Sequence, residues 1–261
     1  MSELIFSDPN LRATLHAPDA PRLVVTFDNR KVGKTDFEPR KPAHNFLKAG
    51  FAQLHIETRA NDWFINPSTH ALERELSTLN ARFDTKRAIG FSMGGYGALR
   101  FSGALGLHEA VVISPQISID RALVPFETRF RREARRFDAD IGAVETANAD
   151  LGGLICYDPF HVLDSAHAAL IMSAFPRLKR VPMALGQHPA TNILRECKAI
   201  GKVQQQVVRG FDAATLKADH RTACRAAALY WTRLAAKAEG RHPDWAAYAT
   251  QQAHAIAAEN S

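Results

Sequence analysis

A serine stands between two glycines in the stretch Gly90-Phe91-Ser92-Met93-Gly94. A serine hydroxyl can attack a carbonyl carbon when a sharp strand-to-helix turn exposes it and a neighbouring base takes its proton. In such a turn the residues two before and two after the serine approach each other closely, so both must be small. The pattern therefore predicts Ser92 as a nucleophile, and an incidental serine in a glycine-rich turn is the alternative.

The acid that orients the base is expected on a loop after a later strand, because the chain order on such a sheet is serine, acid, histidine. Asp158 directly follows the apolar run Gly153 to Tyr157, and the next residue is a proline that stops the strand. We predict Asp158 as this acid, with Asp164 on the same loop as the alternative. A turn-forming role for Asp158 is the structural interpretation.

The base is predicted to be His188, one of eleven histidines. It follows the apolar run Val181 to Leu185 through Gly186, which permits a tight turn at the end of a strand. An exposed loop histidine is the alternative interpretation.

Negative charge that develops on the substrate oxygen requires hydrogen-bond donors. We expect one donor to be the backbone N–H of Met93, and the other to come from the loop after residues 22–27, where Asn29 is preferred and Asp28 is the alternative. Arg59 and Trp63, on the loop after residues 51–56, are candidates for the wall of the substrate pocket. Equally, Arg59 could pair with Asp62 while Trp63 packs under a helix.

Strand and helix patterns alternate along the chain, as a parallel sheet with crossover helices requires. The expected strands are residues 22–27, 51–56, 87–91, 109–114, 153–157 and 181–185. Helical patterns lie between them, ending in an alanine-rich helix at about 222–238 and another after about Trp245. Residues 117–150 are longer and more charged than an ordinary crossover, and they predict either a small helical cap or an elaborate surface crossover.

Bulk composition indicates a globular chain of one domain over residues 1–261. Apolar residues make up 46% and charged residues 23%, and the sequence shows neither a signal peptide nor an apolar run long enough to span a membrane. Three scattered cysteines are too few for a disulfide framework or a zinc site. We therefore expect a cytoplasmic protein without a bound metal.

The formal charge of +6 raises the question of nucleic acid, but no zinc-finger or RNA-binding spacing accompanies it. Six arginines between residues 121 and 136 carry much of the excess. A solvated helix face is the first interpretation, and an anionic substrate or partner is the second.

With Gly90-Phe91-Ser92-Met93-Gly94-Gly95 and the strand-end Asp158 and His188, the chain resembles the α/β-hydrolase superfamily over roughly residues 20 to 235. The resemblance implies an eight-stranded, mostly parallel sheet with helices on both faces, no metal or organic cofactor, and a covalent acyl-enzyme. The loop after Phe27 reads Asp28-Asn29 where the superfamily commonly has a His-Gly pair.

These features predict a serine hydrolase, of esterase or thioesterase type, acting on a small-molecule or glycan acyl substrate. An acyltransferase with the same three residues is one alternative. A non-catalytic binding protein on the same fold is another, because fold alone does not establish activity.

Overall fold

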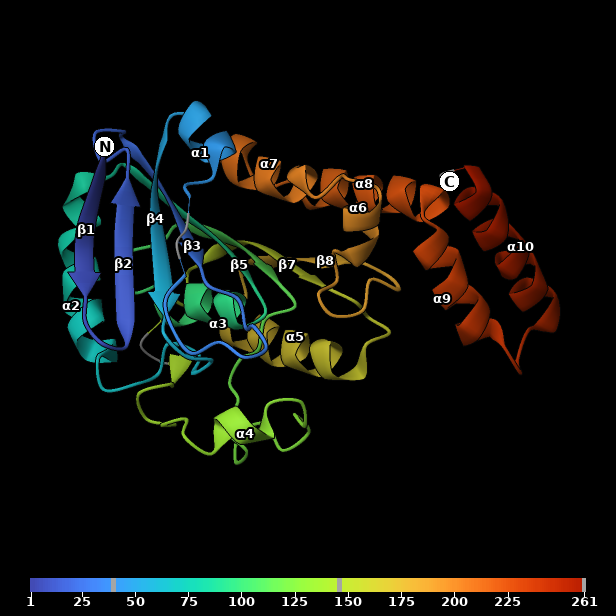
Figure 1. The fold of residues 1–261 in the computed structure, drawn as a ribbon, viewed down its shortest axis with the longest axis horizontal. Helices are drawn as coiled ribbons and strands as arrows, with labels where there is room; N and C mark the ends of the chain where they lie inside the picture. The colour runs from blue at the N-terminus through green and yellow to red at the C-terminus, as the bar shows by residue number, and fades with distance from the viewer. Residues whose placement is uncertain (39–40, 145–146, 260–261) are drawn as a thin grey trace.

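The computed structural model describes residues 1–38, 41–144 and 147–259, and these form one eight-stranded sheet (Figure 1). The strand order is β1-β2-β4-β3-β5-β6-β7-β8. β2 pairs antiparallel with β1 and β4, and the other neighbours are parallel. The strands are β1 (Ser2–Ser7), β2 (Leu11–His16), β3 (Arg22–Phe27), β4 (Phe51–Thr58), β5 (Thr85–Phe91), β6 (Glu109–Ile113), β7 (Gly152–Tyr157) and β8 (Leu178–Pro182).

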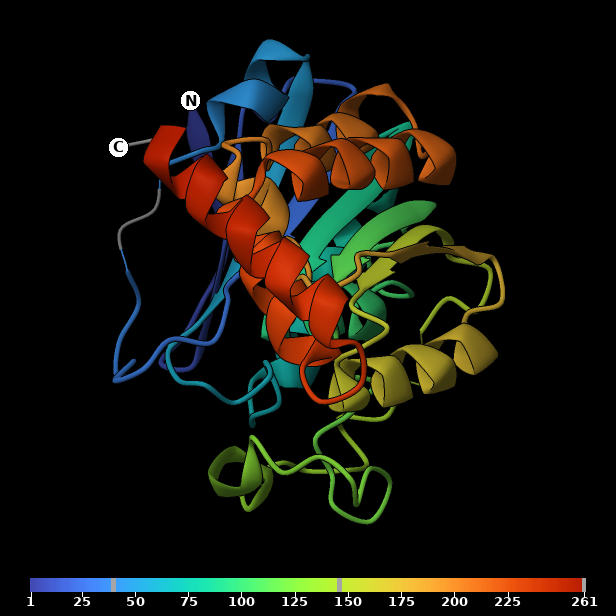
Figure 2. The same ribbon diagram turned by 90° about the vertical axis from the view of Figure 1, so that its right-hand side faces the viewer.

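Helices cover both faces of this sheet (Figure 2). One face carries α2 (Thr69–Thr78), α3 (Met93–Arg100) and α5 (Val162–Ala174). The other carries α1 (His44–Lys48), α6 (Asn192–Glu196), α7 (Gly201–Arg209) and α8 (Ala213–Ala226). A 3-10 turn, Asn80–Arg82, follows α2.

The period-two alternation of a strand separates these two cores. In β3, Leu23 and Val25 belong to the core on the α3 side of the sheet, whereas Val24 belongs to the core on the opposite face. In β6, Val112 and Val111 divide in the same way. Strands buried on both faces explain why the sequence shows continuous apolar runs here.

The mostly parallel α/β architecture is confirmed, with local differences. β8 ends at Pro182, three residues before the expected end, because the chain turns after it and Gly186 N–H bonds the carbonyl of Met183. The alanine-rich segment is two helices, α8 and α9 (Ala228–Ala238), separated at Ala227, which has an extended backbone. β1 and β2 were not expected from the sequence.

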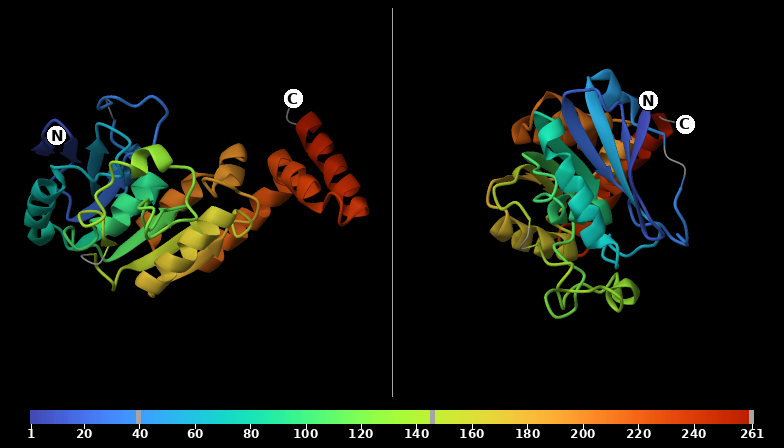
Figure 3. Two further views of the ribbon diagram at one scale, coloured as in Figure 1. Left: turned by 90° about the horizontal axis from the view of Figure 1, so that it is seen from below. Right: turned by 90° about the vertical axis from the view of Figure 1, so that its left-hand side faces the viewer.

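The long crossover lies beyond the carboxyl end of β4, and its described residues contain one short helix, α4 (Arg131–Ala134) (Figure 1). Apart from α4, the described part of this crossover is mostly turns and irregular backbone. At the other extremity, α9 and α10 (Pro243–Glu259) form a hairpin that projects from the body of the molecule (Figure 3). Among the described residues, every helix is too short or too polar to cross a bilayer.

Candidate active site

Ser92 occupies the sharp turn between β5 and α3. Its backbone has φ 51° and ψ −117°, a region that residues with a side chain rarely adopt. A Cβ on Gly90 would lie 2.1 Å from the carbonyl oxygen of Gly94, and a Cβ on Gly94 would lie 2.8 Å from that of Asp28. Both glycines are therefore required by close backbone approaches, as the pattern predicts.

The Ser92 hydroxyl is hydrogen-bonded to a histidine that is itself hydrogen-bonded to an acid. Ser92 Oγ lies 2.9 Å from His188 Nε2, and His188 Nδ1 lies 2.8 Å from Asp164 Oδ2. A carboxylate beside Nδ1 favours a proton on that nitrogen, which leaves Nε2 to accept the serine proton. This is the geometry of an activated serine nucleophile.

The carboxylate beside His188 is that of Asp164, the alternative, and not that of Asp158. Asp158 instead accepts backbone N–H groups of Leu185 at 3.1 Å and Gln187 at 2.7 Å, in the loop that carries His188. It also accepts the N–H of Phe160 at 2.9 Å. Because these bonds direct its oxygens at the backbone, Asp158 shapes the histidine loop and does not reach the imidazole.

Asp164 reaches His188 from the first turn of α5, where a negative charge is favoured by the helix dipole. Its side chain is fully buried, and Arg129 Nη1 donates to its Oδ1 at 2.7 Å. Burial raises the pKa of this carboxyl, but the bonds from His188 and Arg129 outweigh burial and hold the pKa below its usual value. The sequence signal for this position is an acid three residues after a helix N-cap, His161.

Behind Asp164 lies a buried ionic network from the long crossover. Arg129 also donates to Glu127, with Nη2 to Oε2 at 2.6 Å, and His167 Nε2 lies 2.9 Å from the same oxygen. His167 Nδ1 accepts the N–H of Ile117, so its proton is on Nε2 and the ring is neutral. Burial raises the pKa of Glu127, yet the His167 and Arg129 bonds lower it to about 2. Sequence reasoning did not find this network.

Backbone donors for an oxyanion can be located beside Ser92. Met93 is the first residue of α3, where an N–H has no acceptor within the helix. The close approach of Gly94 to Phe27 and Asp28 brings the loop after β3 against the start of α3. Asn29, on this loop, lines the cleft at Ser92, and its buried Oδ1 has no hydrogen-bond partner among the residues that the structure describes.

Arg59 and Trp63 do not line this cleft, in contrast to the expectation. Arg59 is exposed and lies 3.6 Å from Asp36. Trp63 is fully buried, donates from Nε1 to Gln116, and packs against Phe130 with ring centroids 4.7 Å apart. Trp63 therefore supports a cleft residue from behind and does not face the substrate.

The cleft at Ser92 has a volume of about 450 Å³. It is formed by the loop after β3, the serine turn, the crossover, and the segment from His188 into α6. Its lining residues are Asn29, Arg30, Phe91, Ser92, Arg129, Phe130, His188, Pro189, Asn192 and Arg195. Of the arginines between residues 121 and 136, only Arg129 is among them.

A larger cleft, of about 780 Å³, lies between α8, α9 and the end of β8. Lys217, Arg221 and Arg225 line it, together with Tyr230 and Trp231. None of these residues belongs to the Ser92 cleft, so the chemistry of the nucleophile does not extend to this surface.

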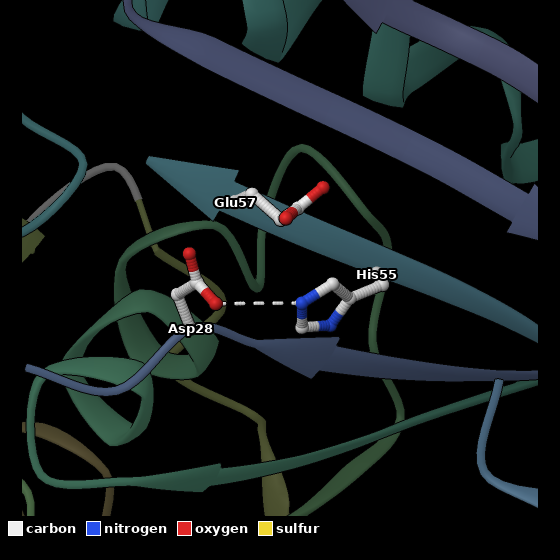
Figure 4. Close-up of side chains that lie close together, drawn as sticks. All are labelled: Asp28, His55 and Glu57. Carbon is white, nitrogen blue, oxygen red and sulfur yellow. Dashed lines mark ion pairs between the residues drawn. The ribbon is translucent and has the colours of Figure 1, made fainter. Parts of the chain in front are cut away.

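Asp28, His55 and Glu57 are the described residues whose ligand atoms could hold a metal ion, within 4.8 Å of one another (Figure 4). Both carboxylates already have cationic partners, because Lys34 binds Asp28 and Arg12 Nε lies 2.7 Å from Glu57. Burial raises the pKa of Asp28, while bonds from His55 and Lys34 lower it to about 2. We interpret this group as a buried ion-pair cluster behind the loop of Asn29.

Comparisons with known proteins find similar folds among solved structures only. No family model matches the chain, and no curated protein matches its sequence. Among solved structures, the capsule O-acetyltransferase of Neisseria meningitidis serogroup A shares 14% identity and a TM-score of 0.53 over 76% of this chain and 93% of that chain. A chain of the Glycosylation Associate Protein (Gap123) complex from Streptococcus agalactiae shares 13% identity and a TM-score of 0.57. This match covers 80% of the present chain and 47% of that chain. A fungal esterase from Rhizomucor miehei shares 12% identity and a TM-score of 0.53, over 85% of this chain and 84% of that chain.

At these identities the likeness concerns the fold. The sheet order, the serine turn after β5 and the structural neighbours agree with the resemblance that the sequence indicates. The chain has an α/β-hydrolase fold.

Proposed function

We propose that this chain is a serine hydrolase that cleaves an ester or thioester through an acyl-enzyme intermediate. The observation that carries the proposal is the continuous hydrogen-bond path from Ser92 through His188 to Asp164 at the base of an open cleft. Structural neighbours that are named as esterases and as an O-acetyltransferase are consistent with acyl chemistry on this fold.

In the proposed reaction, Ser92 Oγ attacks the carbonyl carbon while His188 Nε2 takes the hydroxyl proton. The oxyanion accepts N–H groups of Met93 and Asn29, and Asp164 stabilises the imidazolium. His188 then returns the proton to the leaving alkoxide or thiolate, and the acyl group stays on Ser92. A water molecule, deprotonated by His188, releases the acid and restores the serine.

Labelling with a fluorophosphonate tests the nucleophile directly. We expect intact protein to gain one adduct, located at Ser92 by peptide mass spectrometry, and to hydrolyse p-nitrophenyl acetate. Ser92→Ala should lose both properties, whereas Ser77→Ala, which removes an exposed serine on α2, should keep both. Absence of adduct and of turnover in the intact protein contradicts the proposal and favours a binding protein.

Acyl transfer to an acceptor hydroxyl is a second candidate, because an O-acetyltransferase is among the structural neighbours. Hydrolysis and transfer share every step up to the acyl-enzyme and differ in what attacks it. Product analysis with added acceptor alcohols or sugars separates them. Free acid alone supports hydrolysis, and an ester of the acceptor supports transfer.

A further inference from the structure

The cleft beside Ser92 has an unusual charge distribution. Three arginines line it, Arg30, Arg129 and Arg195, and they come from three separate parts of the chain. Among the described residues that line the cleft there is no carboxylate. Substrate that enters therefore meets guanidinium groups and the amides of Asn29 and Asn192.

Two of these arginines are held by acids that lie outside the lining. Arg30 Nη2 is 2.8 Å from Glu133, and Arg129 bonds Asp164 and Glu127. Both guanidinium groups also lie near the ring of Phe130, at 5.7 and 5.1 Å from its centroid. The ion pairs fix these arginines in position beside the cleft.

Arg195 differs, because within the described part of the chain it has no carboxylate at ion-pair distance. It is exposed, and its guanidinium lies 6.0 Å from the ring centroid of Phe91, the residue that precedes the nucleophile. The neighbouring acid, Glu196, accepts the N–H of Leu229. Arg195 thus brings a positive charge without an ion-pair partner in the described part of the chain to the cleft that holds Ser92, with five N–H donors suited to a carboxylate or phosphate.

We propose that the Ser92 cleft contains an anion subsite, centred on Arg195 and assisted by Arg30, that selects acyl substrates bearing a carboxylate or phosphate group. This inference rests on the proposed function for its catalytic readout only, because the subsite would bind an anion without the chemistry. Arg30 and Arg195 both lie outside residues 121–136, the arginine-rich segment of the sequence, and the fold brings them to one cleft.

A first experiment compares p-nitrophenyl hydrogen adipate, which carries a terminal carboxylate, with p-nitrophenyl hexanoate, its uncharged analogue of equal chain length. We expect a higher kcat/KM for the adipate at low ionic strength, and a preference that declines with added salt. Arg195→Gln and Arg30→Gln should each lower the ratio of the two kcat/KM values, Arg195→Gln by about tenfold. Arg132→Gln removes the same charge from exposed α4 and should leave the ratio unchanged.

A second experiment measures binding without catalysis. In Ser92→Ala protein, calorimetric titration with monomethyl adipate and with butyl phosphate should give lower Kd values than titration with dimethyl adipate. This difference in Kd should disappear in Ser92→Ala/Arg195→Gln. The anion with the lower Kd identifies whether the subsite suits a carboxylate or a phosphate.

The outcomes distinguish this inference from the proposed function. Turnover of both esters with equal kcat/KM, together with labelling of Ser92, refutes the anion subsite and leaves the hydrolase. Preferential anion binding by Ser92→Ala protein, with no labelling and no turnover in the intact chain, supports the subsite and refutes the hydrolase. A preference that survives Arg195→Gln and Arg30→Gln overturns the assignment of these residues.

Discussion

Replacing each of the two candidate acids by asparagine separates their roles. In Asp164→Asn, a neutral amide faces both His188 Nδ1 and Arg129 Nη1, which lie 2.8 and 2.7 Å from the carboxylate oxygens. The amide oxygen is expected to turn toward the Arg129 cation, and its NH₂ group then faces Nδ1. This arrangement favours a proton on Nε2, which can no longer accept the proton of Ser92. Loss of the correct tautomer reduces kcat by about 10³- to 10⁴-fold, or about 4 to 5 kcal/mol of transition-state stabilisation.

Asp158→Asn has a different expected effect. The two oxygens of Asp158 accept three backbone N–H groups, at 2.7 to 3.1 Å. An amide has one oxygen, so at least one N–H of the His188 loop faces an NH₂ group and loses its acceptor. We expect the free energy of unfolding to fall by about 1 to 3 kcal/mol. Because His188 keeps its own acid, kcat should fall by no more than about tenfold.

The assay measures kcat for p-nitrophenyl acetate and unfolding by urea for both variants under the same conditions. In Asp164→Asn, kcat should fall steeply while the free energy of unfolding changes little. In Asp158→Asn, the free energy of unfolding should fall while kcat changes little. A kcat for Asp158→Asn as low as that of Asp164→Asn, in protein that is still folded, refutes this division of roles.

Three further predictions concern the support of the site. Gly90→Ala should abolish fluorophosphonate labelling and lower the melting temperature, because its Cβ would lie 2.1 Å from a backbone carbonyl oxygen; normal labelling contradicts the tight turn. The pKa values of Glu127 and Asp28, each about 2 when folded, are below their ordinary values of 4.5 and 3.8. Their contribution to the free energy of unfolding is therefore complete above about pH 4.5 and is lost as the pH falls toward 2. For Glu127 this contribution is about 3 kcal/mol. Lowering the pH from 6 to 3 should reduce the free energy of unfolding, measured with urea, less in Glu127→Gln than in the unchanged protein. An equal reduction in both refutes the assignment. Arg233→Leu removes two hydrogen bonds to the carbonyls of Leu185 and Gly186, at 2.8 and 3.1 Å; kcat should fall about threefold to tenfold, and an unchanged kcat means that the His188 loop does not need this support.

Local chemistry made the serine turn and the buried strands predictable from the sequence. The backbone approaches at Gly90 and Gly94 demand glycine whatever the rest of the fold, and β3 is apolar because both of its faces are covered. β1 was less evident, because it lies at the edge of the sheet and most of its residues are exposed. Edge strands of this kind leave a weak apolar pattern.

The identity of the acid could not be predicted in the same way, because it depends on how side chains divide among partners. Position after a strand favoured Asp158, and its place at the strand end is what allows it to bind the backbone of the neighbouring loop. Asp164 reaches the histidine only through the placement of α5. Arg30 and Arg195 are similarly unmarked in the sequence, since these two residues, which line one cleft, are 165 positions apart in the chain.

The charges around Asp164 explain why the crossover carries a buried acid. A guanidinium 2.7 Å from Asp164 partly neutralises the negative charge that, in the proposed reaction, stabilises the His188 imidazolium. Glu127, 2.6 Å from the same guanidinium, offsets that effect, because the Glu127–Arg129 pair is neutral as a unit. His167, a neutral donor, binds Glu127 without adding charge. Within the described part of the chain, Asp164 and Glu127 thus share one guanidinium, which leaves this network with a net negative charge beside His188. On this reasoning the crossover orients Asp164 through Arg129 and preserves its charge through Glu127.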